Sequence, residues 1–220
     1  MSEHLTIQQR PESLSDQVFG TIREAIISRT LAPGSAVTEA QLAKDLGVSK
    51  TPVREALLRL REVGLVRSMP IRGMTIIESS RDALIQAYEL RGVLESAVTR
   101  LAALKASDDQ VRDLEAKAQR SLDFAEKLDG ESFRQSDRQF HATVWGAAGN
   151  PELERIAENA YLLSSALRAI HALSSHDSIK CAQQHVAIAA AIKGRDETAA
   201  AELAERHVRD VLQYSMPPGD

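Results

Sequence analysis

The apolar positions between residues 14 and 78 predict three short helices followed by two short strands. Leu14, Val18 and Ile22 recur at helical spacing, which predicts a first helix over residues 14–28. After a Pro-Gly turn the helical spacing resumes in two shorter segments, and two strand-like runs then follow. This pattern is typical of a small domain built mainly of helices.

Two of the helices meet across the segment Gly47-Val48-Ser49. Thr38 and Gln41 are spaced as a capping box at the start of the first helix, and Gly47 supplies a left-handed stop at its end. Ser49 can cap the second helix, and Pro52 in its first turn lacks only a backbone donor that has no helical partner there. The arrangement is a helix-turn-helix pattern, whose second helix enters the major groove of DNA.

The second helix of this pair separates apolar from basic positions. Val53, Leu57 and Leu60 are expected to face inward. The residues left to project are Lys50, Thr51, Arg54, Arg59 and Arg61. An ordinary pair of core helices with a solvated basic face would show the same spacing, so the pattern alone leaves that alternative open.

Two strands over residues 64–67 and 74–77, with Arg72 and Gly73 at the tip between them, predict a wing beside the helix pair. With this wing the segment resembles the winged-helix domain of GntR-type transcription regulators. The residues that carry the resemblance are Pro33-Gly34, GVSKTPVREAL, Arg59-Leu60, Glu62-Val63-Gly64-Leu65-Val66 and Arg72-Gly73. It implies a winged helix-turn-helix DNA-binding domain over residues 1–78.

The resemblance also implies which side chains contact DNA. Lys50, Thr51, Arg54 and Gly73 occupy positions at which the family contacts DNA, and Arg54 is suited to bidentate reading of a guanine edge. Two further candidates are Arg59, for packing or the DNA backbone, and Arg72, for phosphate or the minor groove. Position 50 is often arginine in this family, so lysine here is expected to discriminate bases differently.

Residues 79–220 are expected to form an all-α bundle. Strand-forming residues are sparse there, while Ala, Leu, Glu and Arg dominate. Polar and Gly-containing breaks divide the region into helices over about residues 82–105, 107–128, 131–148, 151–173, 179–193 and 197–214. The predicted fold is therefore mostly α, with a winged helix followed by about six further helices.

Composition narrows the setting of the protein. The formal net charge is -4, and residues 1–78 carry 10 Lys and Arg against 9 Asp and Glu, so DNA binding must depend on local placement of basic residues. A single cysteine excludes an internal disulfide. No signal region or long apolar run is present, so we expect a cytoplasmic protein without a membrane partner.

Four residues concentrate the chemistry of the second region. Asp137 and His141 are four residues apart and project from one helical face. His185 and His207 lie nine residues before and thirteen after the turn at Gly194, which places them at similar depth on antiparallel helices. Such a set suits zinc, nickel, manganese or iron. An intrahelical Asp–His pair and isolated core histidines remain the alternative.

The same segments resemble the FCD domain that follows the wing in one GntR subfamily. They are Asp137-Arg138-Gln139-Phe140-His141, AAGNPEL, Gln184-His185 and Glu205-Arg206-His207. The resemblance implies a divalent metal, zinc foremost, on Asp137, His141, His185 and His207. His4, His171 and His176 lack such partners and are expected to be structural or solvated.

The resemblance further implies that a small organic or sugar acid binds beside the metal. Arg91 matches a family arginine suited to capturing a carboxylate, with pairing to Glu95 or Glu89 as its structural alternative, and Arg168 is a second candidate. The predicted protein is a homodimeric repressor of a metabolic operon on a palindromic operator, without catalytic residues. A metal-dependent hydrolase or hydratase, and a ligand-independent DNA-binding dimer with a structural metal, are the alternatives.

Overall fold

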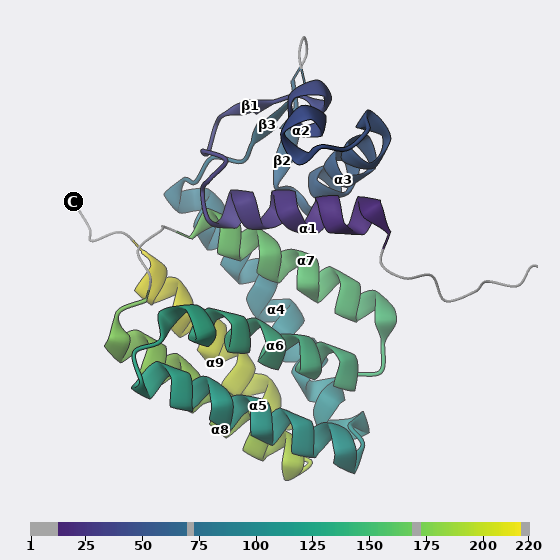
Figure 1. Ribbon diagram of the computed structural model, residues 1–220. Helices are drawn as coiled ribbons and strands as arrows, with labels where there is room; N and C mark the ends of the chain where they lie inside the picture. The colour runs from purple at the N-terminus through teal and green to yellow at the C-terminus, as the bar shows by residue number, and fades with distance from the viewer. Residues whose placement is uncertain (1–12, 70–72, 169–172, 217–220) are drawn as a thin grey trace, which may run out of the picture. The chain divides into compact units, whose positions relative to one another are not determined.

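The computed structural model describes residues 13–69, 73–168 and 173–216. The chain separates into two compact units, residues 1–78 and 79–220 (Figure 1). Among the residues described, no helix combines the length and apolar character needed to cross a membrane.

Within its described residues, the first unit contains three helices and a three-stranded sheet. The helices are α1 (Leu14–Ile27), α2 (Glu39–Leu46) and α3 (Lys50–Val63), and the strands are β1 (Ala36–Val37), β2 (Val66–Ser68) and β3 (Met74–Ile76). The strand order is β1-β3-β2 with antiparallel neighbours. Val53, Leu57 and Leu60 are buried as predicted, and they pack α3 into the core with Ile22 and Leu65.

Three local predictions in this unit need correction or completion. Strand β1 was not predicted, because two residues are too short to show an alternating pattern. The side chain of Thr38 accepts a hydrogen bond from the backbone N–H of Gln41, but the side-chain amide of Gln41 donates to Asp45 instead of returning to Thr38, so the capping box is only half formed. Ser49 stands at the cap position of α3 without a capping side-chain hydrogen bond. Gly47 is left-handed, as predicted.

Among the described residues of the second unit, the regular secondary structure is entirely helical. Its helices are α4 (Arg81–Lys105), α5 (Asp108–Glu126), α6 (Gly130–Ala147), α7 (Pro151–Leu167), α8 (Ser175–Lys193) and α9 (Glu197–Ser215). Helix α4 packs against α7 and α9, while α5 packs against α6 and α8 (Figure 1). Leu114, Phe140 and Ile192 lie in the buried core that α4, α5, α6, α8 and α9 share.

The boundary between α7 and α8 differs from the prediction. Helix α7 ends at Leu167 rather than at residue 173, and α8 begins at Ser175 rather than at residue 179. The side chain of Ser174 accepts a hydrogen bond from the backbone of Asp177, so the polar segment that indicated a break is the capped first turn of α8. The helical phase of His185 is unaffected, because the added residues extend the same helix.

Candidate functional site

Arg54, on the exposed face of α3, is held by hydrogen bonds to a neighbouring helix. Its Nε atom donates to both carboxylate oxygens of Glu39 on α2, at 2.9 and 3.1 Å, and its Nη2 atom donates to Oε2 at 2.9 Å. Lys50 and Thr51 are exposed one turn earlier on the same helix. The ion pair therefore orients the guanidinium beside the other predicted DNA contacts.

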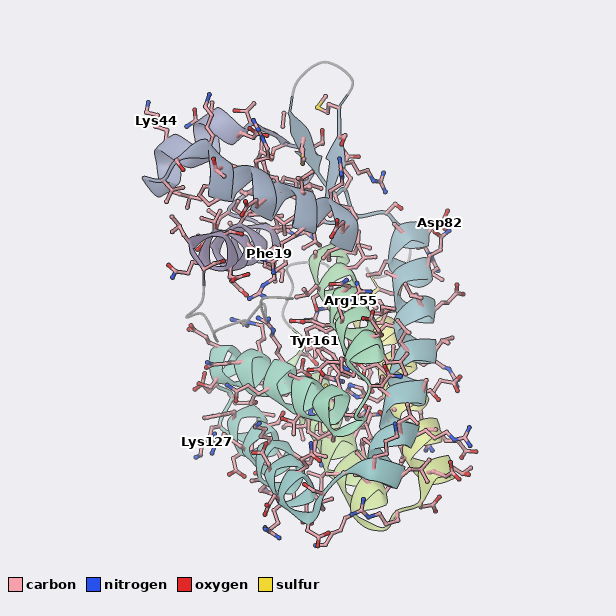
Figure 2. All side chains as sticks on the ribbon, turned by 90° about the vertical axis from the view of Figure 1, so that its right-hand side faces the viewer. Phe19, Lys44, Asp82, Lys127, Arg155 and Tyr161 are labelled. Carbon is pink, nitrogen blue, oxygen red and sulfur yellow. The ribbon has the colours of Figure 1, made fainter. Side chains whose placement is uncertain are left out.

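Arg59 has a packing role within the first unit. Its Nη1 atom lies 2.6 Å from Oδ1 of Asp16 on α1, and its guanidinium sits 4.3 Å from the ring centre of Phe19, a residue labelled in Figure 2. These contacts agree with the packing alternative predicted for Arg59, and its contact with the DNA backbone stays a prediction. Arg72 lies outside the described residues.

Gly73 has a structural reason to be glycine. Its φ angle is +68°, in the left-handed region that favours glycine, and a Cβ there would overlap the backbone oxygen of Val37. The residue is exposed beside strand β3. Close approach of the wing to β1 therefore requires glycine at this position whether or not the position contacts DNA.

In the second unit, three helices bring three buried histidines together. His141 on α6, His185 on α8 and His207 on α9 have ring centres 4.8 to 5.3 Å apart. One ring nitrogen from each lies within 4.8 Å of the others. The predicted neighbourhood of His185 and His207 is present, and His141 joins it. His176 is exposed, whereas His4 and His171 fall outside the described residues.

The Nδ1 atom of each of these histidines has a polar partner away from the cluster centre. The partners are Glu95 Oε1 at 3.2 Å for His141, Ser121 Oγ at 3.4 Å for His185 and Gln184 Oε1 at 3.0 Å for His207. Such partners fix the orientation of a metal-binding imidazole. They leave the Nε2 atoms of His185 and His207 to serve as ligands, whereas Nε2 of His141 lies 3.1 Å from Nη2 of Arg91.

Nε2 of His207 is buried and has no hydrogen-bond partner among the described residues. A buried polar atom without a partner is costly, and an unseen ion is one ordinary explanation. The neighbouring histidines supply the nitrogen ligands that zinc and similar ions prefer. These residues therefore fit a divalent metal ion.

Asp137, the fourth predicted ligand, lies beside His185 and forms a group with His185 and Cys181 that is distinct from the cluster of three histidines. Its Oδ1 atom lies 3.5 Å from Nε2 of His185, and the hydroxyl of Tyr161, labelled in Figure 2, donates to Oδ2 at 2.7 Å. Burial opposes ionisation of Asp137, but nearby His141, His185 and Arg91 outweigh it and lower the pKa to about 2. The carboxylate is therefore ionised, with one oxygen held by Tyr161 and the other directed toward the histidines.

Burial keeps two of the imidazoles neutral at physiological pH. It lowers the pKa of His185 to about 3, although the charge of Asp137 acts in the opposite direction. It also lowers the pKa of His207 well below the ordinary value, and the other two histidines act in the same direction. Neutral imidazole is the form that binds metals.

Arg91 lies inside the bundle next to the histidines. Its Nη2 atom is 3.1 Å from Nε2 of His141, and its Nε atom is 3.4 Å from Oε1 of Glu95. The indole of Trp145 donates to the other oxygen of Glu95 at 3.0 Å. The structural alternative foreseen for Arg91, a pair with Glu95, is therefore present at the candidate site itself.

Arg168 follows the end of α7 and belongs to the same electrostatic neighbourhood. Burial opposes its charge, but Tyr88, Tyr161, Asp137 and Cys181 raise its pKa above the ordinary value. The negative charge of Asp137 therefore favours the charged form of both arginines that are predicted to bind an acid.

Glu95, Tyr161 and Cys181 also lie at the candidate site, although they were not predicted as site residues. For two of them a signal was present, because Glu95 follows Arg91 by four residues and Cys181 precedes His185 by four. No sequence pattern pointed to Tyr161, which lies on another helix and meets Asp137 only through the packing of α6 and α7.

Comparison with known proteins identifies two adjoining matches. Residues 14–76 match the family described as bacterial regulatory proteins, gntR family, and residues 86–210 match the FCD domain. The chain is 29% identical to the Nta operon transcriptional regulator of Aminobacter aminovorans over 191 residues, covering 85% of this chain and 89% of the relative.

Other similar proteins are also regulators. The probable D-xylose utilization operon transcriptional repressor of Paenarthrobacter nicotinovorans is 30% identical over 202 residues, covering 91% of this chain and 88% of the relative. The solved structure of E. coli McbR/YncC has a TM-score of 0.78 at 24% identity, covering 91% of this chain and 96% of that one, which supports the fold. These similarities are to regulators rather than enzymes, which excludes the hydrolase and hydratase alternatives.

Proposed function

The chain belongs to the GntR family of bacterial regulatory proteins and is a DNA-binding transcriptional regulator with an FCD domain, and from that premise we propose that a small carboxylate controls its operator affinity. The acid is proposed to bind beside a divalent metal within residues 79–220. The observation that carries this proposal is the buried, unpartnered Nε2 atom of His207 among two further histidines.

We assign the metal to Asp137, His141, His185 and His207. The polar partners of the three Nδ1 atoms support this assignment, because they make Nε2 the nitrogen of each imidazole that would bind the metal. A bound divalent ion would supply a positive centre for one carboxylate oxygen of an acid. Zinc is the first candidate because nitrogen ligands predominate, with nickel, manganese and iron as further candidates.

The acid is proposed to engage Arg91, whose planar guanidinium suits a carboxylate, with Arg168 as a second contact. The cavity lined by Glu95, His141 and His207 is too narrow for an organic acid with the side chains in their present positions. Because Nη2 of Arg91 lies 3.1 Å from Nε2 of His141, binding of the metal and the acid requires Arg91 to move away from His141, a change that couples both ligands to the packing of α4 against α6. Such differential contact is what allows a ligand to shift a conformational equilibrium.

On the DNA side, Arg54 is proposed to read a base edge and Lys50 to contact phosphate or base, with Thr51 and Gly73 close to the backbone. Glu39 holds the Arg54 guanidinium in a defined direction before DNA arrives. Because this pair is exposed, exchanging the carboxylate for a guanine edge costs little.

Repression and dimerisation complete the proposal. One helix-turn-helix reads few base pairs, so a two-fold dimer on a palindromic operator is the simplest specific assembly. Two similar proteins carry names that describe repressors, the D-xylose operon protein and HTH-type transcriptional repressor RspR of Escherichia coli. We therefore propose a homodimeric repressor that its acid ligand releases from DNA.

Native mass spectrometry of the full chain tests the proposed dimer, metal and acid. We expect a dimer with one metal ion per chain, and a small acid retained from the cell or added from a panel of organic and sugar acids. His207→Ala should lose the metal, whereas His176→Ala, which alters an exposed histidine outside the cluster, should keep it. A chain that takes up no zinc, nickel or manganese would refute the metal assignment.

Footprinting on DNA fragments selected from a random library tests the DNA half. We expect protection of two inverted half-sites, weakened by the active acid. A monomer that protects one unpaired half-site would refute the dimer. Binding that is unchanged by every acid and by chelation, together with lower thermal stability on chelation, would instead establish a ligand-independent regulator with a structural metal.

A further inference from the structure

Cys181 lies on α8 one helical turn before His185, and its side chain is buried. Its Sγ atom is 3.9 Å from Nε2 of His185 and 3.7 Å from Oδ1 of Asp137. Both of these atoms belong to the proposed metal ligands. The sulfur of Cys181 therefore lies next to two atoms that are proposed to bind the metal.

The distances around Cys181 match those of a shared ion. Ligand atoms of Asp137, Cys181 and His185 all lie within 4.8 Å of one another, and His185 also belongs to the histidine cluster. With Zn–N and Zn–O distances of about 2.0–2.2 Å and Zn–S of about 2.3 Å, neighbouring ligand atoms stand roughly 3–4 Å apart. The buried Nε2 atom of His207, which has no partner among the described residues, points independently to a ligand in the adjoining histidine cluster, to which His185 also belongs.

We infer that Cys181 is a further metal ligand and that its sulfur makes the site selective for thiolate-binding ions, zinc above all, over manganese. This inference rests on the metal site of the proposed function and adds a sulfur ligand to its nitrogen and oxygen ligands. Soft sulfur ligands favour zinc, whereas manganese prefers carboxylate and other oxygen ligands.

Ligation replaces the S–H bond with a sulfur–metal bond. The thiol proton passes to solvent, and neither the sulfur nor the metal changes oxidation state. In the absence of a cation the S–H group donates to Oδ1 of Asp137, so the cysteine also has a purely structural partner. If Cys181 is a ligand, the spectrum of a bound metal ion contains a sulfur signal, whereas a purely structural cysteine gives no such signal. Spectroscopy can therefore distinguish the two roles.

Cobalt(II) absorption of the full chain is the decisive measurement, because the sequence contains a single cysteine and any thiolate signal must come from it. We expect visible d–d bands together with a near-ultraviolet sulfur-to-cobalt charge-transfer band. Cys181→Ala should retain the d–d bands and lose the sulfur band. X-ray absorption of the zinc form should show a sulfur neighbour at about 2.3 Å that the variant lacks.

Binding measurements sharpen the test. Cys181→Ala should weaken zinc binding by at least about tenfold, the smallest loss typical of removing even an outer partner, and should weaken manganese binding less. Zinc uptake by the unchanged protein should release about one more proton than uptake by the variant. Near-ultraviolet circular dichroism of Trp145 verifies folding, and Cys181→Ser provides a second variant of similar size.

The outcomes separate this inference from the proposed function. Cobalt or zinc bound without any sulfur signal, and with equal zinc affinity in the variant, would overturn the role of Cys181 and leave the metal site standing. A folded chain that binds no cobalt or zinc would overturn both. A sulfur signal lost in Cys181→Ala, while metal is retained, would establish the ligand.

Discussion

Each unit of this protein contains one arginine–glutamate pair at a proposed binding site, and the two pairs differ in their exposure to solvent. In the winged helix, the side chains of Arg54 and Glu39 are 64% and 32% exposed. In the helical bundle, those of Arg91 and Glu95 are 4% and 2% exposed. The same kind of ion pair is therefore in contact with solvent in one unit and shielded from solvent in the other.

The difference in burial implies different roles. An exposed ion pair contributes little to stability, so Arg54 can exchange its partner for DNA at small cost. A buried pair that loses one member leaves an uncompensated charge, so Arg91 can leave its neighbours only if another anion replaces them. The first pair suits reversible reading of DNA, and the second suits a switch that responds to a carboxylate.

The largest effect is expected when the buried pair is broken. Glu95→Ala leaves the Arg91 charge unpaired and removes the partners of His141 and Trp145, which should lower the free energy of unfolding by about 3–5 kcal/mol. Urea unfolding followed by fluorescence of the single tryptophan, Trp145, measures it in the bundle itself. A loss below about 1 kcal/mol would mean that burial does not distinguish the pairs.

Acid should next destabilise the bundle through its histidines. In metal-free protein the pKa of His185 is about 3, below its ordinary 6.5, so between these values the unfolded chain binds a proton that the folded chain does not. The free energy of unfolding should therefore fall by a few kcal/mol as pH falls through this window. Asp137 and Glu95, with pKa values lowered to about 2, add a further loss below pH 4.5.

The same tryptophan signal in urea, recorded across pH with a chelator present, measures this acid effect. His185→Gln should show a shallower dependence above pH 4.5, because its amide does not titrate. An equal slope in the two proteins would contradict the burial-driven pKa.

A moderate effect is expected when the exposed pair loses its arginine. Arg54→Ala should reduce discrimination of the selected operator from a mutated half-site by about 1–3 kcal/mol, the value of one bidentate base contact. Competition binding at fixed salt measures it. Arg61→Ala, which removes an exposed charge at the far end of α3, should weaken both DNAs alike.

The smallest effect is expected at Glu39. Glu39→Ala should change the local stability of α2 and α3 by less than about 1 kcal/mol, because Arg54 is exposed and Glu39 is partly exposed. Hydrogen–deuterium exchange of peptides covering residues 39–63 measures the change. A loss as large as that of Glu95→Ala would show that the surface pair stabilises the winged helix and is not merely an orienting contact.

Much of the fold was predictable because its signals are local. Helix spacing, the left-handed Gly47 and the apolar face of Val53, Leu57 and Leu60 all depend on residues near in sequence. The prediction was wrong where a polar segment is compatible with either a loop or a helix start. Ser174, which was predicted to lie in the break between two helices, caps the first turn of α8. Strand β1 was missed because its two residues form a strand only by pairing with β3.

By itself, the sequence determined which side chains share a helical face, since that depends only on spacing: Asp137 with His141, Arg91 with Glu95, and Cys181 with His185. It also indicated the DNA-binding class through contiguous motifs. Only the tertiary structure decided which faces meet, how deeply each charge is buried and which atoms lack partners. These properties depend on packing between distant segments, so Arg54 and Arg91, alike as residues, acquire different roles.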